Sequence, residues 1–260
     1  MTGECRSLHP LHLAAPAPTI PLDTAPLWRR VLDNIILPRR YNASSWQAYY
    51  DDLVEVLLWK VEGRRAFSNA SALQSLRTVE VGTMYGGATE RILQRLAGRA
   101  REHFVVDPFL TGFDDLHDSK SREYGAEAKR AGITNQQLSR AWAKGMAFDF
   151  QEKFGCRCQL LYAKSLEAAP HFADGSLDAA FIDGLHTYRG VLADIQAWWP
   201  KLSSHGGVML FNDYASSHYP GVERAVKEFM QARGLKRHIA VGHRGRPPGW
   251  RNAYVVKWRD

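Results

Sequence analysis

The chain is poor in cysteine and has no long apolar run. Its 260 residues include only three cysteines, Cys5, Cys156 and Cys158. So few thiols do not make a disulfide framework, and a structural zinc site needs four ligands. No apolar run reaches the roughly 18–20 residues of a membrane span, and the first residues lack the continuous apolar core of a secretory signal. These absences predict an intracellular protein without a membrane span, in the cytoplasm or imported into an organelle.

The chain also has fewer acidic than basic residues. The chain has 27 Asp and Glu residues against 34 Lys and Arg residues, which gives a formal net charge of +7. Such an excess suits an anionic partner, but a nucleic-acid surface requires basic residues interleaved with aromatic residues along one stripe. Here the basic residues are mostly scattered. We therefore expect no nucleic acid as a partner and a small-molecule substrate, which can be anionic; the sequence leaves a homo-oligomer open.

The order of the apolar segments predicts an α/β fold. Residues 1–45 are rich in proline at their start and predict a loose N-terminal extension. Residues 46–260 are expected to form one domain that begins with an amphipathic helix over 46–61. Short apolar runs then alternate with helical periodicities, which is typical of a doubly wound, mainly parallel sheet. The seven expected strands, with the last one antiparallel, cover 77–82, 103–107, 158–162, 177–183, 206–213, 237–242 and 252–258.

The segment 108–153 does not fit this alternation. It is too long for a simple crossover between strands, and it begins with polar turns. Helical periodicity follows over residues 136–154. We interpret the segment as an insertion that packs near the site and forms a cap over the substrate.

The stretch VEVGTMYGGATERIL (79–93) places glycines where the first strand meets the following helix. Gly82 removes a side chain where a cofactor must touch the backbone, and the helix start offers unpaired N–H groups. Asp107 ends the next strand, 25 residues after Gly82, where a carboxylate can accept both hydroxyls of a ribose. The glycine spacing differs from the G-x-G-x-x-G pattern of dinucleotide-binding loops. This difference disfavours an NAD-dependent oxidoreductase but leaves it open as an alternative.

A second group of polar residues lies where two later strands end. Asp183 and His186 follow one apolar run, and Asn212 and Asp213 end the next, 29 and 30 residues after Asp183. If the two strands are neighbours in a parallel sheet, these side chains converge at one edge. Carboxylate and amide oxygens are hard ligands that suit Mg²⁺ or a similar ion. A histidine beside them can serve as a general base.

These motifs resemble those of a known family. The first is similar to the E/D-x-G-x-x-x-G loop of class I S-adenosylmethionine-dependent methyltransferases. The stretch FIDGLHTYRGVLADIQAWWPKLSSHGGVMLFNDY (181–214) resembles the D-G-x-H-x-Y … G-G-x-x-x-x-x-D-Y segment of methyltransferase family 24. Macrocin-type and catechol-type metal-dependent O-methyltransferases are similar too. The resemblance covers about residues 77–230 and implies the Rossmann-like fold of class I methyltransferases.

The resemblance also implies a reaction and its residues. The reaction would be metal-assisted O-methylation of a hydroxyl on a small molecule of sugar, polyketide or phenolic type, with S-adenosyl-L-methionine and a divalent metal, Mg²⁺ above all, as cofactors. The catalytic residues would be Asp183 and His186, the latter as general base, and the metal ligands would be Asp183, Asn212 and Asp213. The cofactor-binding residues would be Glu80, Gly82, Thr83, Tyr85, Gly86, Asp107 and Ser165. Many macrocin-type enzymes have two carboxylates where this chain has Asn-Asp, so an ion here would be less neutralised.

Two further points stay open. A non-catalytic S-adenosylmethionine-binding protein is the second alternative, although binding alone needs neither His186 nor Asp213. The loop 242–251 carries Arg244, Arg246 and Arg251, and it leaves on the edge of the site if the sixth strand is parallel to the first five. The loop would then either capture a carboxylate or phosphate of the substrate or be a solvated basic turn.

Overall fold

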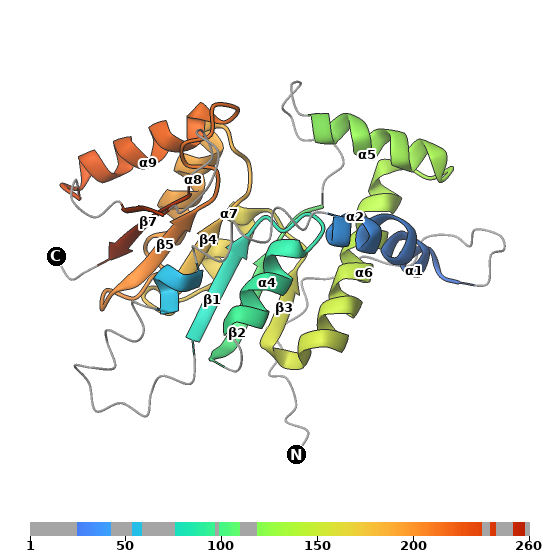
Figure 1. The fold of residues 1–260 in the computed structure, drawn as a ribbon, viewed down its shortest axis with the longest axis horizontal. Coiled ribbons are helices and arrows are strands. Elements are labelled where there is room, and N and C mark those ends of the chain that lie inside the picture. Colours follow the sequence, from blue (N-terminus) through green and yellow to red (C-terminus); the bar gives the residue numbers. More distant parts are fainter. Residues whose placement is uncertain are drawn as a thin grey trace, which may run out of the picture.

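A computed structural model describes residues 25–42, 54–58, 76–96, 99–109, 119–235, 240–242 and 252–257. Seven strands form one sheet in the order β3-β2-β1-β4-β5-β7-β6 (Figure 1). The strands are β1 (Leu76–Val81), β2 (Ala100–Val106), β3 (Cys158–Leu161), β4 (Ala179–Ile182), β5 (Gly207–Phe211), β6 (Ala240–Gly242) and β7 (Asn252–Lys257). β1 to β5 pair in parallel, and β7 is antiparallel to both β5 and β6. The predicted α/β fold with its antiparallel last strand is confirmed.

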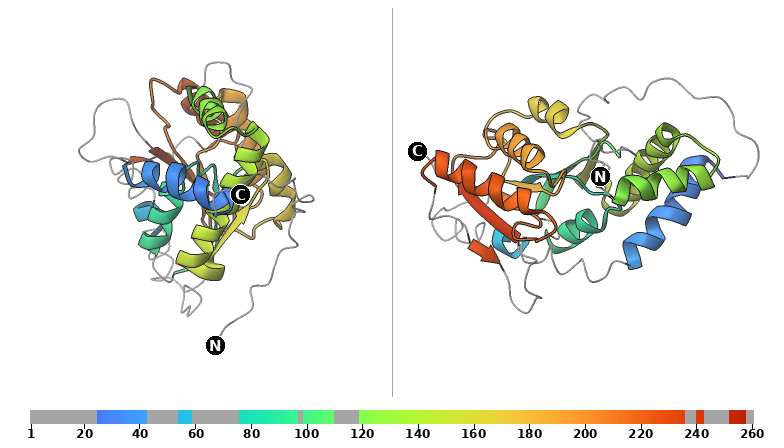
Figure 2. Two further views of the ribbon diagram at one scale, coloured as in Figure 1. Left: turned by 90° about the vertical axis from the view of Figure 1, so that its right-hand side faces the viewer. Right: turned by 90° about the horizontal axis from the view of Figure 1, so that it is seen from above.

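Helices cover both faces of the sheet, as the view from above in Figure 2 shows. They are α4 (Gly87–Leu96), α5 (Ser119–Arg130), α6 (Asn135–Phe154), α7 (Ser165–Ala168), α8 (Tyr188–Trp198) and α9 (Pro220–Ala232). Residues 54–58 are helical as well. Apolar side chains of α4 and α6 belong to one core, and those of α7, α8 and α9 belong to the other. Successive strand residues point to opposite faces, so Phe181 enters the first core and Ile182 the second.

The local sequence fixes where the helices near the strand ends begin. Thr187 caps α8, because its hydroxyl accepts a hydrogen bond from the N–H of Gly190. Pro220 opens α9 at a position where a missing N–H costs nothing. Both helices therefore start close to predicted site residues, α8 just after His186 and its capping residue Thr187, and α9 shortly after Asp213.

The described part of the N-terminal segment differs from the loose extension expected for residues 1–45. It is helical from α1 (Leu27–Val31) through a π-helical turn (Leu32–Ile36) to α2 (Leu37–Asn42). This helix packs on α6 at Gly145, where an added Cβ would lie 3.0 Å from the carbonyl oxygen of Trp28. Close backbone approach and the burial of apolar side chains hold the segment against the domain.

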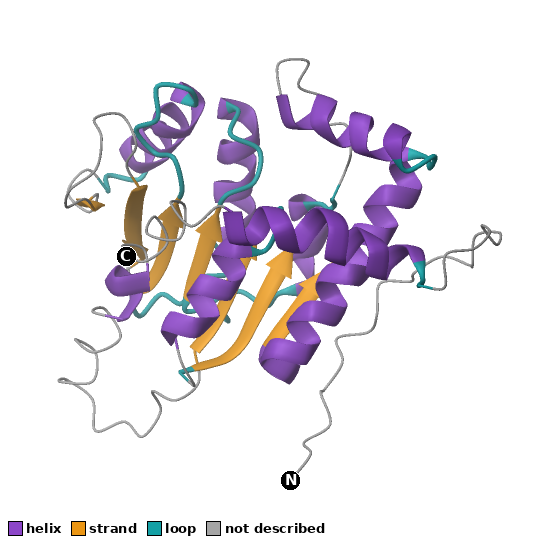
Figure 3. Ribbon diagram, turned by 45° about the vertical axis from the view of Figure 1, so that its right-hand side comes forward, coloured by secondary structure: helices purple, strands orange, loops and turns teal. Residues whose placement is uncertain are grey.

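The segment 108–153 is more helical than expected. α6 confirms the predicted helix and begins with a capping box between Thr134 and Gln137. α5, however, occupies part of the stretch that was expected to form polar turns. Figure 3 shows α5 on the side of the sheet toward which the parallel strands run. The role of the segment as a substrate cap stays a prediction.

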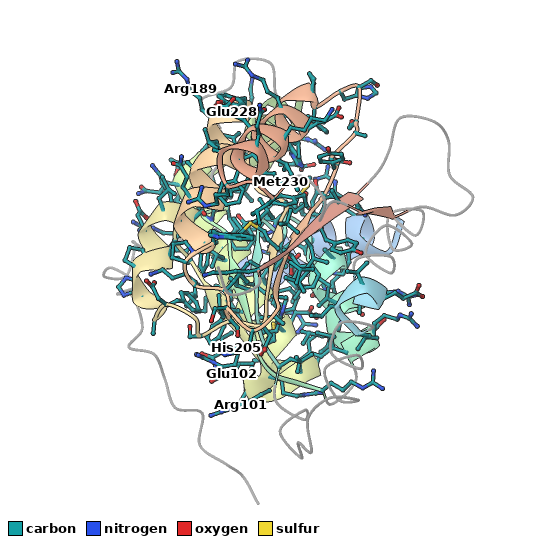
Figure 4. The ribbon with its side chains drawn as sticks, turned by 90° about the vertical axis from the view of Figure 1, so that its left-hand side faces the viewer. Arg101, Glu102, Arg189, His205, Glu228 and Met230 are labelled. Atoms are coloured by element: carbon teal, nitrogen blue, oxygen red, sulfur yellow. The ribbon has the colours of Figure 1, made fainter. Side chains whose placement is uncertain are left out.

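The two ends of the sheet carry different residues. Figure 4 labels Arg101, Glu102 and His205 at one end of the molecule, and Arg189 and Glu228 at the other. The first three residues begin β2 or precede β5, so they mark the amino ends of the parallel strands. The candidate site lies at the opposite edge, where these strands end.

The structure bears on two expectations, one about the cysteines and one about membrane-spanning helices. Cys158 is a buried free thiol, whereas Cys156 is disulfide-bonded. Within the described residues, no helix combines the length and the apolar character needed to cross a membrane.

Candidate active site

The cofactor loop, defined here as Gly82–Gly86, joins β1 to α4. Gly82 has a φ of 87°, and a Cβ at this position would collide with the backbone carbonyl of Asp183 at the end of β4. Gly86 has a φ of 80°, and a Cβ there would lie 2.5 Å from Cε of Met146 and 2.7 Å from a guanidinium nitrogen of Arg40. Both positions therefore require glycine, for the backbone angle and for the close packing. Gly82 places the loop directly against the second group of predicted site residues.

Glu80 lies beneath this loop in a buried polar network. Its Oε2 accepts a hydrogen bond of 2.6 Å from the hydroxyl of Thr89 and lies 3.2 Å from Nε2 of His103. The Thr89 hydroxyl also lies 2.5 Å from that of Thr83. Burial raises the pKa of Glu80, and the contact with His103 partly opposes this. Among the described residues, Glu80 Oε1 is a buried oxygen without a hydrogen-bond partner. Direct contact of Glu80 with the cofactor stays a prediction.

Asp107 follows β2, and its carboxylate binds backbone N–H groups of the cofactor loop. Its Oδ2 accepts hydrogen bonds from the N–H groups of Thr83 and Met84, at 2.8 and 3.0 Å, and its Oδ1 accepts one of 2.7 Å from Phe109. Burial raises the pKa of Asp107, while the three N–H groups act in the opposite direction. A carboxylate has roughly four acceptor sites, so capacity for a ribose hydroxyl remains. While these three bonds are kept, Asp107 can accept one ribose hydroxyl and not the two that were predicted.

The side chain of Tyr85 packs against residues of α2 and α6. Its ring packs on Trp142 of α6, with the ring centroids 5.3 Å apart, and the guanidinium of Arg39 lies 5.7 Å from its centroid. Its carbonyl accepts a hydrogen bond of 2.6 Å from Nε of Arg40. The structure thus adds contacts from α2 and α6 that the sequence did not indicate.

Ser165 opens α7 and faces α8. Its hydroxyl accepts a hydrogen bond of 2.9 Å from the indole N–H of Trp198 and also bonds with the carboxyl of Asp194. Burial raises the pKa of Asp194 to about 6. Asp194 also packs under the strand end, because a Cβ added at Gly184 would lie 3.3 Å from Asp194 Oδ2. Asp194 was not among the predicted site residues, although its spacing of three residues from Val191 places it on the buried side of the helix.

The second region, called the acid cluster here, consists of Asp183, His186, Asn212 and Asp213. The parallel pairing of β4 with β5 brings the ends of these strands together, as predicted. Nε2 of His186 lies 3.2 Å from Oδ1 of Asp183 and 3.5 Å from Oδ2 of Asp213. One ligand atom from each of these three residues lies within 4.8 Å of the others, which is close enough for a shared metal ion.

Asn212 and Asp213 present buried oxygens to this cluster. Asn212 donates a hydrogen bond of 2.8 Å through Nδ2 to Oδ1 of Asp183. Among the described residues, Asn212 Oδ1 and Asp213 Oδ1 are buried without a hydrogen-bond partner. Burial and the charge of Asp183 raise the pKa of Asp213 to about 6, while His186 lowers it. Asp213 also has a φ of 54°, an uncommon angle for a residue other than glycine.

Comparison with known proteins decides the family. A family model described as a methyltransferase domain matches residues 79–214, which is more than half of the 260 residues. The chain belongs to this methyltransferase family. The match runs from β1 to the end of the acid cluster, so it includes both candidate regions. It confirms the resemblance to methyltransferase family 24 and removes the NAD-dependent oxidoreductase alternative.

Individual relatives are more distant. The methyltransferase is 33% identical over 145 residues to the uncharacterized protein y4gI of Sinorhizobium fredii (strain NBRC 101917 / NGR234). That match covers 55% of this chain but only 13% of the relative. Among solved structures, the carbon methyltransferase DszA is 15% identical, with a TM-score of 0.51 over 82% of this chain and 55% of that one. The O-methyltransferase NovP is 18% identical, with a TM-score of 0.47 and 80% of each chain covered. At 15% identity, the likeness to DszA is one of fold alone.

The start of α9, which was not among the predicted site segments, fixes His186 in the methyltransferase. The ring of Tyr219 stacks on the imidazole, with centroids 4.4 Å apart and planes inclined by 24°. Two residues later, Gly221 lets α9 approach the backbone, because a Cβ there would lie 2.5 Å from the nitrogen of Tyr188 and 3.0 Å from the carbonyl oxygen of His186. The start of α9 therefore holds both the ring and the main chain of His186. Arg244, Arg246 and Arg251 lie outside the described residues, although β6 has the expected direction.

Proposed function

We propose that this methyltransferase transfers the methyl group of S-adenosylmethionine to a hydroxyl oxygen of a small molecule, with the help of a divalent cation. The observation that carries the proposal is the convergence of Asp183, His186 and Asp213 within 4.8 Å beside Gly82 of the cofactor loop. Mere cofactor binding needs neither a histidine nor two carboxylates at that place. This argues against a non-catalytic binding protein.

The residues of the acid cluster fit a divalent cation. Asp213 Oδ1 and Asn212 Oδ1 are buried acceptors without a partner among the described residues, and carboxylate and amide oxygens are the ligands that Mg²⁺ prefers. Asp183, Asn212 and Asp213 would hold the ion, and His186 would lie beside it as the base. When bound, a divalent cation supplies Lewis acidity that lowers the pKa of an acceptor hydroxyl and orients it.

His186 would take the proton of the acceptor. In the transfer, the acceptor oxygen forms a bond to the methyl carbon while the bond from that carbon to sulfur breaks, and the electron pair stays on sulfur. The hydroxyl proton moves to Nε2 of His186, which lies 3.2 and 3.5 Å from carboxylate oxygens of Asp183 and Asp213. The imidazolium that forms is stabilised by these two carboxylates. Tyr219 holds the ring in place, so little freedom is lost when the acceptor arrives.

The proposed acceptor remains a small molecule of sugar, polyketide or phenolic type. Residues 108–153 are proposed to help enclose it, and the basic loop with Arg244, Arg246 and Arg251 is proposed to hold an anionic group if the acceptor carries one. A positive net charge of +7 is compatible with such an acceptor.

The test uses S-adenosylmethionine with a deuterated methyl group and a panel of sugars, phenols and polyketides that carry free hydroxyls. Mass spectrometry detects the labelled product, and fragmentation shows whether oxygen or carbon received the methyl group. We expect an O-methylated product with Mg²⁺ and none after treatment with a chelator. A labelled carbon atom would contradict the choice of acceptor atom, and full activity with excess chelator would remove the cation from the proposal.

A further inference from the structure

The backbone carbonyls of the cofactor loop are bound from three directions. The carbonyl of Thr83 accepts a hydrogen bond of 2.8 Å from the N–H of Gly86. The carbonyl of Gly86 accepts one of 3.0 Å from the N–H of Glu90. The carbonyl of Met84 accepts a bond of 3.0 Å from the indole N–H of Trp142 in α6. The carbonyl of Tyr85 accepts one from Arg40 in α2. Among the four carbonyls of residues 83–86, two are thus held by side chains from helices outside the β1–α4 unit.

Arg40 is built into this position. Its side chain is only 1% exposed, and one guanidinium nitrogen is paired with Asp149 of α6 and lies 3.3 Å from Glu90 of α4. Another nitrogen lies 3.1 Å from the sulfur of Met146, and the guanidinium lies 5.5 Å from the centroid of the Phe150 ring. These contacts fix the two terminal nitrogens of the guanidinium. Nε then faces the cofactor loop, where it bonds to the carbonyl of Tyr85. A buried arginine so enclosed cannot adopt another rotamer without leaving charges unpaired.

Met84 is the strained residue of the loop. Its φ is 53°, in the left-handed region that residues other than glycine seldom adopt. Such strain persists only where the surroundings enforce it. The N–H of Met84 donates a hydrogen bond to Asp107, and its carbonyl accepts one from Trp142. Both backbone polar groups of this residue are therefore bound by side chains.

We propose that Arg40 and Trp142 are positioning residues that keep the cofactor loop in the conformation that binds S-adenosylmethionine. This inference rests on the cofactor binding that the proposed function places at this loop. Nε of Arg40 and the indole N–H of Trp142 both bond to loop carbonyls, and the other nitrogens of Arg40 contact α4 and α6, so removal of either side chain frees the loop more than it weakens the sheet. The N-terminal helix and α6 are then parts of the cofactor site, although neither carries a predicted cofactor residue.

Trp142→Phe is the sharper variant, because it keeps an aromatic ring beside Tyr85 and removes the N–H that bonds to Met84. Arg40→Lys keeps the buried charge but cannot make all the bonds of the guanidinium. Trp28→Phe and Arg29→Lys are matched controls on α1, where Trp28 packs on Phe148 and Arg29 pairs with Asp33. Calorimetry measures the affinity for S-adenosylhomocysteine, and thermal unfolding of the same samples measures stability.

We expect Trp142→Phe to weaken binding about 3- to 10-fold and Arg40→Lys at least about tenfold, as expected for losing a neutral and a charged hydrogen bond. Hydrogen exchange at the amides of Thr83 and Met84 should become faster in both variants, whereas exchange in β4 and β5 and the affinity of the two controls should not change. If Arg40→Lys does not fold, Trp142→Phe alone carries the test. Unchanged affinity and exchange in a folded Trp142→Phe variant would overturn the inference, as would an equal loss in Trp28→Phe. Absence of binding to the wild-type protein would instead contradict the proposed function.

Discussion

The cofactor loop and the acid cluster lie side by side at one edge of the sheet, yet their polar atoms are satisfied differently. Each carbonyl of residues 83–86 accepts a hydrogen bond, and Asp107 accepts three from N–H groups. In the acid cluster, by contrast, Asn212 Oδ1 and Asp213 Oδ1 are buried without a partner as far as the described chain extends. The carbonyls of residues 83–86 are paired before a ligand arrives, whereas the acid cluster presents acceptors that a ligand can complete.

This difference has an energetic consequence. A buried acceptor without a partner costs about 1–3 kcal/mol, and a ligand that supplies the missing contact recovers that free energy. The acid cluster should therefore gain stability from a bound cation, and the cofactor loop should not depend on one. Gly82, which touches the backbone of Asp183, is the point at which the two regions meet.

The largest expected effect comes from replacing His186, which should change turnover and leave cofactor affinity nearly unchanged. His186→Ala should lower turnover about 10²–10⁴-fold, because the acceptor loses its general base. The affinity for S-adenosylmethionine should stay within about twofold, since the cofactor loop keeps all its bonds. Single-turnover kinetics and calorimetry on the same variant measure the two quantities. A parallel loss of affinity and turnover would break the division of roles.

Gly82→Ala should damage both regions at once. The added methyl group meets the Asp183 carbonyl, and alanine is disfavoured at a φ of 87°. A backbone shift on the order of 1 Å should weaken cofactor binding and lower turnover, each about 10²-fold. Gly175→Ala is the matched control, because Gly175 also has a positive φ, 72°, and a Cβ there has no neighbour within 4 Å in the part of the chain that the structure describes. Damage to only one of the two functions would show that the regions are independent at this contact.

Asp194 lies close to Gly184 and Ser165 and should make stability depend on pH. Its pKa in the folded protein, about 6, is above the ordinary value of 3.8, so the folded chain binds this proton more tightly than the unfolded chain. Its contribution to stability is therefore largest below pH 4, and about 2 kcal/mol of it is lost as the pH rises from 4 to 6. Asp194→Asn cannot titrate, and its stability should fall less over this range. Urea unfolding of both proteins at several pH values gives the comparison, and identical slopes would contradict the assigned burial of a neutral Asp194.

The smallest effect is expected at Tyr219. Tyr219→Ala removes the ring that stacks on His186 and should lower kcat about tenfold through loss of orientation, with cofactor affinity unchanged. Tyr219→Phe keeps the ring and should retain most of the activity. Equal losses in both variants would assign the effect to the hydroxyl group instead of the stacking.

Much of this arrangement follows from local sequence patterns. Apolar runs and glycines predicted the strands, and the parallel order of β4 and β5 was enough to bring Asp183 and Asp213 together. These predictions succeeded because strand ends in a parallel sheet meet at one edge whatever the connecting helices do.

Contacts between distant segments could not be predicted in this way. Arg40 and Asp149 are 109 residues apart, and an arginine is expected at the surface unless its partner is known. The stacking of Tyr219 on His186 likewise depends on where α9 begins relative to α8. Burial of Asp194 was detectable in principle from its helical spacing, but the pattern does not distinguish a buried carboxyl from one at the rim.

The central claim is that the acid cluster, and not the cofactor loop, needs a cation. Electron paramagnetic resonance with Mn²⁺ tests it directly, on the wild-type protein and on Asp213→Asn, alongside calorimetry of S-adenosylhomocysteine with and without a chelator. We predict that the wild-type protein binds Mn²⁺ and that Asp213→Asn binds it at least about tenfold more weakly. Both proteins should bind the cofactor product equally, whether or not the chelator is present. Equal Mn²⁺ binding by the two proteins, no Mn²⁺ binding by either, or loss of cofactor binding in the chelator would contradict the claim.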